Sequence, residues 1–402
     1  MTLGVGGSTF AVELDRLRQL VGEIPTISHD EYRKRIKAAQ AKMKEKGIEA
    51  LFLDASKNLS YFTGMSISVT ERLHGALLPA DGEIAYLSPT FEIPKTREML
   101  ILEGDVRGWE EHEDPTALAL DMLAGMGISQ GAIGLDPQTR FFTVEGFRRG
   151  GNRYDFVNGS VITAACRSRK SDSEIAIIKY LNDITLEVHR SVAAVLYDGM
   201  SARQLRAFAV EAFAVFGAVL PGGLFLFGPG TAYPHGVPYD QKLSEGEMVL
   251  VDMSCELGGY RSDITRSYVF GTPTERQRFL WSVEQEAQAT AFSAAKLGVP
   301  IEEIDYAARR VLGKAGFSSD YATPGLPHRT GHGIGMDVHE EEYIVRGNRT
   351  ALAAGMCFTI EPTICIYDEC GIRLEDCAYA AEDGVHWFTE PAKFMDNPFN
   401  LS

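Results

Sequence analysis

Two acidic residues lie in strand-like segments that a tight turn connects. Asp252 lies within the apolar segment 248–254, and Asp263 follows Gly258-Gly259 in a second strand-like segment. Gly-Gly between two such segments predicts a hairpin with a two-residue loop. In that register Asp252 faces Thr265, and Asp263 lies two residues away on the same face of the sheet. We therefore expect the two carboxylates to be diagonal neighbours.

A second pair of acids follows the same plan nearer the C-terminus. Glu361 ends the apolar segment 356–361, and residues 371–376 form its expected partner. A three-residue loop centred on Asp368 would place Glu361 opposite Glu375. Four carboxylates in apolar strands are unfavourable unless positive charge lies among them. Two divalent cations would supply that charge, since bridging carboxylates commonly hold paired metal ions.

Arginine pairing is the alternative explanation for these acids. Asp252 and Glu375 could be acids at strand ends that pair with Arg261 or Arg373. This alternative suits any one acid taken alone. It explains less well the presence of four acids in two hairpins, and we therefore favour a metal site.

Four histidines accompany the acids in glycine-rich segments. Three of them lie within residues 328–339, and His235 lies in the loop-like segment 228–236. A single histidine in a loop is usually solvated, but this density beside four strand acids favours a role in the site. One imidazole with four carboxylates would form a hard, oxygen-rich site that favours Mn²⁺, or Co²⁺ or Zn²⁺ by availability. The three clustered histidines are His328, His332 and His339.

Helix and strand signals that position these residues indicate two domains. Residues 1–165 alternate helix and strand signals, including a helix from Ser28 to Gly47 that opens with a capping-box pattern. A polar, basic segment, 167–173, precedes a long helical segment and then β-rich segments punctuated by glycine. Further helix starts are marked by Ser201 with Gln204, by residues 272–275 and by residues 300–303. We expect an α/β N-terminal domain, 1–165, and an α+β C-terminal domain, 166–402.

The composition and net charge of the chain argue against some classes of binding partner. The chain has 402 residues, of which 45% are hydrophobic and 23% charged, which is typical of a soluble globular protein. Its 39 basic and 55 acidic residues give a net charge of −16, which argues against binding to nucleic acid or to an anionic membrane surface. No membrane span or signal peptide is recognisable. Six cysteines without Cys-x-x-Cys spacing favour reduced thiols and a cytoplasmic location.

Four motifs in this order resemble those of the pita-bread metallopeptidases, which include methionine aminopeptidase, aminopeptidase P and prolidase. The N-terminal half resembles the creatinase/prolidase N-domain, and its segment 58–64, Asn-Leu-Ser-Tyr-Phe-Thr-Gly, follows the first strand. Details at 109–115 and 324–332 are most similar to bacterial Xaa-Pro dipeptidases. The four motifs are Val-Asp-Met with Tyr-Arg-Ser-Asp-Ile-Thr-Arg, Gly-His-Gly-Ile-Gly-Met-Asp-Val-His-Glu, Gly-Met-Cys-Phe-Thr-Ile-Glu-Pro and Gly-Ile-Arg-Leu-Glu-Asp.

The resemblance implies a pita-bread C-terminal domain with two metal ions per subunit. Asp252 would bind one ion, Asp263 and Glu375 would bridge both, and His332 and Glu361 would bind the second. Two ions that share a water lower its pKa and yield a hydroxide nucleophile near neutral pH. Glu361 would accept a proton as that water attacks the peptide bond.

The resemblance also assigns roles in substrate binding. His235 and His339 would line the pocket, stabilise the oxyanion and help to transfer a proton to the proline nitrogen. His328 and Arg373 resemble residues that support the site or bind a substrate carboxylate. Arg346 and Arg349 are further carboxylate-binding candidates, although each is better explained as part of a solvated loop.

The activity that the resemblance implies is cleavage of Xaa-Pro dipeptides, with a small peptide as substrate and a homodimer as the expected assembly. Alternatives are aminopeptidase P activity on longer peptides, a non-peptidase reaction such as ectoine hydrolysis, and peptide binding without catalysis. The sequence departs from the family's Glu-Pro-Gly-Ile-Tyr at Thr363 and Cys365, near the expected substrate pocket. Candidates for an edge contributed by the partner subunit are Glu71, Arg72, Trp109 and His112, although ordinary packing or surface explains each one more simply.

Overall fold

The computed structural model describes residues 2–401, which divide into two compact units. One unit is Ile27–Arg167, and the other contains the chain up to Thr26 and from Ser168 onward. The predicted range of 1–165 therefore differs from the N-terminal unit in its first 26 residues. Helix α1 (Phe10–Arg18) explains the difference, because it packs on helices of the C-terminal unit, where Arg16 pairs with Glu187 at 2.7 Å.

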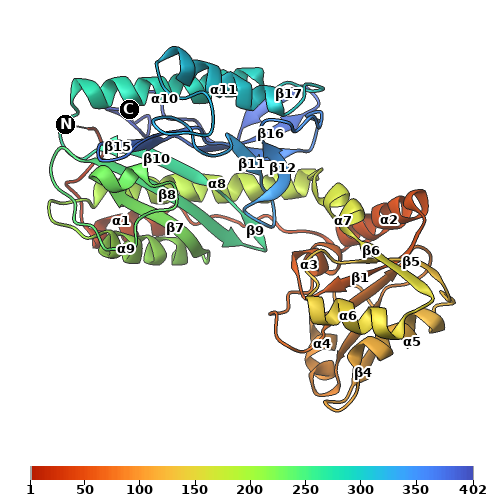
Figure 1. Ribbon diagram of the computed structural model, residues 1–402. Helices are drawn as coiled ribbons and strands as arrows, with labels where there is room; N and C mark the ends of the chain where they lie inside the picture. Colours follow the sequence, from red (N-terminus) through yellow and green to blue (C-terminus); the bar gives the residue numbers. More distant parts are fainter. Residues whose placement is uncertain (1, 402) are drawn as a thin grey trace. The chain divides into compact units, whose positions relative to one another are not determined.

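The N-terminal unit is built on a mixed six-stranded sheet with the strand order β4-β3-β2-β1-β5-β6. Strand β1 is parallel to β5 and antiparallel to β2, and Phe52, Leu77 and Phe147 lie in the core against this sheet. This is the predicted α/β domain (Figure 1). Its strands are β1 (Ile48–Asp54), β2 (Gly75–Pro79), β3 (Ala85–Pro89), β4 (Asp105–Trp109), β5 (Gly131–Leu135) and β6 (Tyr154–Asn158). Its helices are α2 (His29–Lys46), α3 (Lys57–Thr63), η1 (Thr90–Glu92), α4 (Ile93–Met99), α5 (Pro115–Gly125), α6 (Phe141–Gly150) and α7 (Ser160–Arg167).

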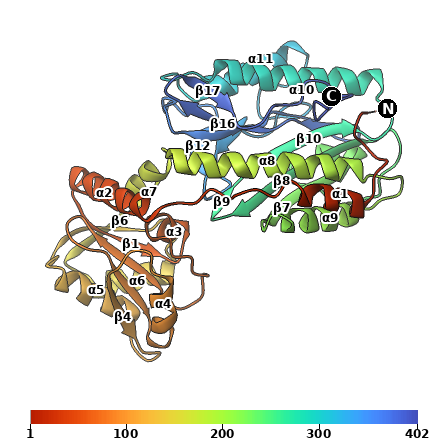
Figure 2. The same cartoon turned by 180° about the vertical axis from the view of Figure 1, so that it is seen from behind.

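In the C-terminal unit, strands lie between two groups of helices. Helices α8 and α9 lie with α1 on one side, and α10 and α11 lie on the other side (Figures 1 and 2). The helices are α8 (Asp172–Ala194), α9 (Ala202–Ala214), η2 (Gly228–Ala232), α10 (Glu275–Ala294) and α11 (Glu302–Lys314). None of the helices in residues 2–401 combines the length and apolar character needed to span a bilayer.

The strands of this unit form three sheets, ordered β10-β8-β7 with β9 beside β8, β12-β11-β13-β16-β17, and β14-β15. The first sheet contains β7 (Val219–Phe227), β8 (Met248–Leu257), β9 (Tyr260–Arg261) and β10 (Ile264–Val269). The second contains β11 (Gly331–Gly333), β12 (Glu340–Ile344), β13 (Cys357–Ile360), β16 (Asp376–Ala381) and β17 (Gly384–Trp387), and the third contains β14 (Thr363–Ile366) and β15 (Cys370–Arg373).

Both predicted hairpin registers are confirmed. Asp252 pairs with Thr265, and Gly258-Gly259 forms the loop, with φ angles of 61° and 83° that suit glycine. In the second hairpin, Thr363 pairs with Arg373 around a loop whose central residue, Asp368, has a φ of 64°. The same register continues into the pairing of β13 with β16, so Glu361 and Glu375 lie opposite each other between these two ladders.

One predicted helix start is displaced. The pattern at 272–275 placed the cap at Thr272 and Pro273 at the first helical position, but α10 begins at Glu275 with Thr274 as its N-cap. The Thr274 side chain accepts from the Gln277 amide, and the Gln277 side chain accepts from the Thr274 amide. The displacement arises because the reciprocal partner in this capping box is a glutamine two residues beyond Glu275.

Candidate metal centre

Thr265 joins the two acid-bearing hairpins. On one side it pairs with Asp252 in the β8–β10 ladder, and on the other it forms a backbone bridge with Glu375. Its hydroxyl donates to Glu375 Oε2 at 2.6 Å. Thr265 therefore holds carboxylates from segments more than 100 residues apart around a common point.

The acids converge on His332, which lies in the short strand β11. Its Nε2 lies 3.7 Å from Asp263 Oδ2 and 3.2 Å from Glu361 Oε1. Ligand atoms of Asp263, His332 and Glu375 all lie within 4.8 Å of one another, and these residues are only 6%, 1% and 2% exposed. The structure thus brings together the histidine and acids that the sequence singled out, with Asp252 in the wall of the same pocket.

The ring of His332 is oriented for coordination. Its Nδ1 lies 3.0 Å from the Gly333 carbonyl oxygen. Because a carbonyl can only accept, Nδ1 carries the proton of this hydrogen bond. Nε2 is then the atom that faces the carboxylates, 3.2 Å from Glu361 Oε1, and a cation that displaced its proton would find a lone pair there.

Arg373 lies among the carboxylates as their nearest guanidinium. Its Nη2 donates to Asp252 Oδ2 at 2.6 Å, and its Nε donates to the Thr265 hydroxyl at 3.1 Å. The alternative of arginine pairing is therefore correct for Asp252, whereas Arg261 pairs with Glu256 at 2.6 Å. Arg373 is buried and already partnered, and its binding of a substrate carboxylate stays a prediction.

The pKa values show that the cluster has too little positive charge. Burial raises the pKa of Asp263 and Glu375 well above their ordinary values, and the charges of neighbouring carboxylates raise them further. Burial also raises the pKa of Asp252, against the opposing effect of Arg373. Glu361 differs, because its hydrogen bond with His332 and the nearby positive charges outweigh burial and lower its pKa to about 2.

This charge pattern suits divalent cations. Four carboxylates share one guanidinium and one imidazole, so the protein alone does not balance their charge. Oxygen donors with a single imidazole nitrogen form the donor set that hard and borderline divalent ions prefer. The residues present therefore fit the metal dependence expected from the sequence.

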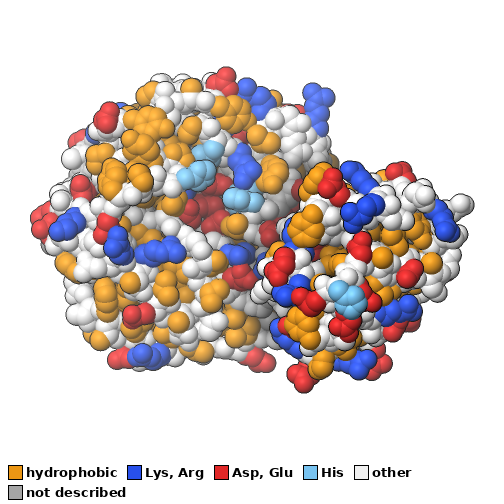
Figure 3. Space-filling view, turned by 60° about the horizontal axis from the view of Figure 1, so that its bottom comes forward, with side chains coloured by type: hydrophobic (Ala, Val, Ile, Leu, Met, Phe, Trp, Pro, Cys, Tyr) orange, Lys and Arg blue, Asp and Glu red, His pale blue; other side chains and the backbone are white. Residues whose placement is uncertain are grey.

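The carboxylates line a pocket of about 860 Å³. In Figure 3 acidic side chains lie at the bottom of a hollow on the larger unit, with histidines at its margin. The four predicted histidines all contribute to the pocket lining, and residues on β7, including Gly223 and Leu224, form part of its wall. The pocket is large enough for a dipeptide-sized ligand.

The three histidines that surround His332 differ in their surroundings. His339 packs edge-on against His332 with ring centroids 4.3 Å apart, and burial followed by the charges of His332 and Arg329 lowers its pKa to about 4. His328 is held at both nitrogens, by the Arg329 carbonyl at 2.7 Å and the Thr363 hydroxyl at 3.1 Å, and burial lowers its pKa. His235 is exposed at the pocket wall.

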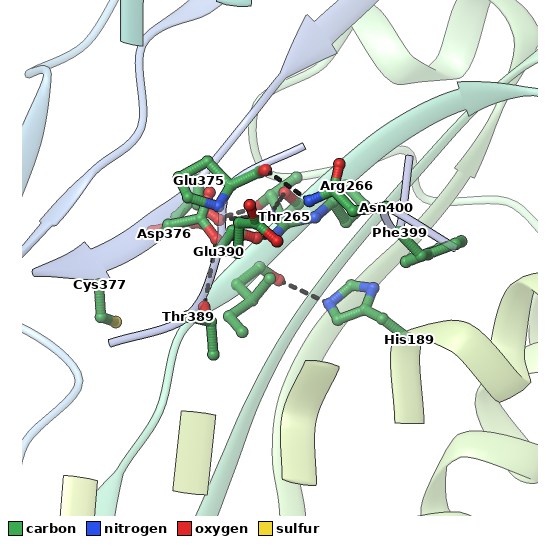
Figure 4. Close-up of polar contacts among 12 residues, drawn as sticks. His189, Thr265, Arg266, Glu375, Asp376, Cys377, Thr389, Glu390, Phe399 and Asn400 are labelled. Atoms are coloured by element: carbon green, nitrogen blue, oxygen red, sulfur yellow. Dashed lines mark hydrogen bonds and ion pairs between the residues drawn. The ribbon is translucent and has the colours of Figure 1, made fainter. Parts of the chain in front are cut away.

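A buried ion pair between Arg266 and Asp376 lies next to the site carboxylates. Arg266 donates to Asp376 Oδ1 at 2.6 Å and to the backbone carbonyls of Thr265 and Glu375 (Figure 4). It thereby ties β10 to the segment that carries Glu375 and Asp376. In the sequence Arg266 is only the last residue of the motif Tyr-Arg-Ser-Asp-Ile-Thr-Arg, because its contact with Asp376 spans 110 positions and leaves no local signal.

Comparisons with known proteins identify families for both units. The sequence pattern of metallopeptidase family M24 matches residues 176–382. The pattern of the creatinase/prolidase N-terminal domain matches residues 35–169.

Among individual relatives, the probable dipeptidase PepE of Mycobacterium tuberculosis is 32% identical over 367 residues, which cover 88% of this chain and 93% of the relative. The crystal structure of dipeptidase PepE from Mycobacterium ulcerans aligns with a TM-score of 0.84 at 31% identity, covering 92% of this chain and 99% of that one. The prolidase of Thermococcus sibiricus aligns with a TM-score of 0.82 at 29% identity, covering 89% and 97%.

Proposed function

The chain belongs to metallopeptidase family M24, and we propose that it is an Xaa-Pro dipeptidase that uses two divalent cations. Its relatives include named dipeptidases and a prolidase, and its fold is the pita-bread domain with a creatinase-type N-terminal domain. The observation that carries the proposal is the convergence of Asp263, Glu361 and Glu375 on His332, with Asp252 in the wall of the same dipeptide-sized pocket.

The cations would be held by Asp252, Asp263, His332, Glu361 and Glu375. When bound, two divalent cations supply a water of lowered pKa and polarise the substrate carbonyl. Mn²⁺ is the expected ion, with Co²⁺ or Zn²⁺ as alternatives.

The protein's own groups would manage the protons and the developing charge. Glu361 would accept the proton of the attacking water, and it is ionised at neutral pH because its pKa is about 2. His339, whose pKa is about 4, would be a neutral imidazole whose N–H donates to the oxyanion. His235 on the pocket wall would assist transfer of a proton to the proline nitrogen.

Hydrolysis of Ala-Pro by the purified protein tests the proposal. We expect proline release that stops after chelation and returns with Mn²⁺, and faster cleavage of Ala-Pro than of Ala-Ala or of a longer Ala-Pro peptide. Asp263→Asn should abolish the activity, whereas Asp320→Asn, at an exposed acid outside the pocket, should retain it. Activity that survives chelation, or a preference for the longer peptide, would overturn the proposal.

A further inference from the structure

Arg329 lies in the pocket wall beside two of the site histidines. It lines the same pocket as His328 and His339. Its guanidinium lies over the ring of Tyr343, 4.4 Å from the centroid. Stacking of this kind holds the guanidinium plane in place and leaves its N–H edge free to donate to a planar anion.

The other arginines near the pocket already have carboxylate partners. Arg373 pairs with Asp252, and Arg261 pairs with Glu256. Within residues 2–401, Arg329 is the pocket-lining arginine that forms no ion pair with a carboxylate of the protein. Arg329 is partly buried, so a ligand that brings a negative charge to its guanidinium would form a favourable ion pair.

The two loop arginines considered from the sequence are less suitable. Arg346 pairs with Asp320 at 3.2 Å and lies over Tyr321, and Arg349 lies 3.5 Å from Glu302 with a side chain that is 86% exposed. Neither of them lines the pocket.

The backbone on both sides of Arg329 is fixed from helix α11. Arg309 donates to the carbonyls of Leu326 at 3.1 Å and His328 at 2.6 Å. Its partner Asp305 accepts from the Thr330 hydroxyl at 2.7 Å. Arg329 is therefore a pre-organised group, because its flanking backbone and its side chain are both held before a ligand arrives.

We propose that Arg329 binds the C-terminal carboxylate of the substrate and thereby makes the enzyme selective for dipeptides. This inference rests on the proposed function. The acids at the bottom of the pocket repel a free carboxylate, so the C-terminus of a dipeptide must be held on the wall by a cation. A longer peptide presents an uncharged amide at that point and lacks the bidentate ion pair.

Binding of an uncleavable ligand tests this role separately from catalysis. The ligand is Ala-Pro in which a methylene replaces the scissile carbonyl, prepared as the free acid and as the C-terminal amide. Calorimetry with the Mn²⁺-loaded protein should show the acid binding at least about tenfold more tightly than the amide. Arg329→Gln should remove most of this preference, and Arg329→Lys should retain part of it.

Arg346→Gln is the matched control and should keep the preference for the acid. An acid preference that survives in Arg329→Gln, a wild-type protein without a preference, or a wild-type protein that binds neither ligand would each overturn the proposal. Ala-Pro hydrolysis measured on the same preparation separates the two claims. Hydrolysis without acid preference contradicts the role of Arg329 alone, and acid preference without hydrolysis contradicts the proposed function alone.

Discussion

At the scale of single residues, burial and pairing decide how each charged group behaves. Arg373 is stabilised by the carboxylates around it, and it in turn reduces their mutual repulsion. Glu284 on α10 is the opposite case, because it is fully buried and no cationic side chain in residues 2–401 forms an ion pair with it. Arg373 is needed by the site, whereas burial of Glu284 lowers the stability of the fold.

Substitution of Arg373 should destabilise the protein most when no metal is present. Breaking a buried ion pair costs about 3–5 kcal/mol, and Arg373→Gln also leaves the carboxylates without their guanidinium. We expect a loss of that order in urea unfolding after chelation and a smaller loss with Mn²⁺. Arg276→Gln, which removes an exposed pair with Glu369, should cost less than about 1 kcal/mol. Equal losses for Arg373→Gln with and without Mn²⁺ would contradict this account.

Substitution of Glu284 should stabilise the protein, and more so at high pH. Burial raises the pKa of Glu284 well above its ordinary value, so the folded state retains a proton that the unfolded state releases. Stability then falls as pH rises above the unfolded pKa, and Glu284→Gln removes this dependence. We expect a gain on the order of 2 kcal/mol at pH 7.5 that shrinks towards pH 4.5, measured by urea unfolding. A gain independent of pH would show that Glu284 is not protonated in the fold.

At the scale of elements, hairpins position the acids and helix α11 positions the segment that carries His328 and Arg329. The hairpin registers could be predicted because Gly258-Gly259 and the loop at Asp368 fix which residues lie opposite each other. The anchoring by Arg309 could not be predicted, because it depends on a helix and a loop meeting in three dimensions. Arg329 follows the predicted site residue His328 in the sequence, but its contact with Tyr343 can be seen only in the structure.

Loss of the α11 anchor should reduce activity without touching the acids. Arg309→Met breaks the buried pair with Asp305 and releases the carbonyls of Leu326 and His328. We expect kcat/KM for Ala-Pro to fall about tenfold or more, together with a loss of about 3 kcal/mol in stability. Arg310→Met, at an exposed neighbour on the same helix, should change neither. An unchanged kcat/KM in Arg309→Met would show that the segment holds its position without the anchor.

At the scale of the whole molecule, the N-terminal segment belongs to the catalytic unit although the sequence placed it with the N-terminal domain. The reason is a set of long-range contacts, since Ser191 donates to Glu13 and Arg16 to Glu187 across more than 170 positions. No local pattern marks such contacts. The expected homodimer stays a prediction, which sedimentation analysis of the purified protein would test.

Deletion of residues 1–26 should therefore weaken the catalytic unit. The deletion removes α1, which contacts α8 and α9. It also exposes apolar surface such as Phe208, whose ring centroid lies 4.7 Å from that of Phe10. We expect Tm to fall by several degrees in a thermal melt followed by circular dichroism. An unchanged Tm would show that this segment adds nothing to the stability of the unit.

If the converging carboxylates hold two catalytic cations, then activity must depend on bound metal. In the most direct test, metal is removed from the protein with a chelator and Mn²⁺ is then added back in steps. Bound metal and release of proline from Ala-Pro are measured on the same samples. We expect activity to be absent without metal, to rise as metal binds and to saturate at about two ions per chain. Proline release from the metal-free protein, or saturation of metal binding with no proline released, would contradict it.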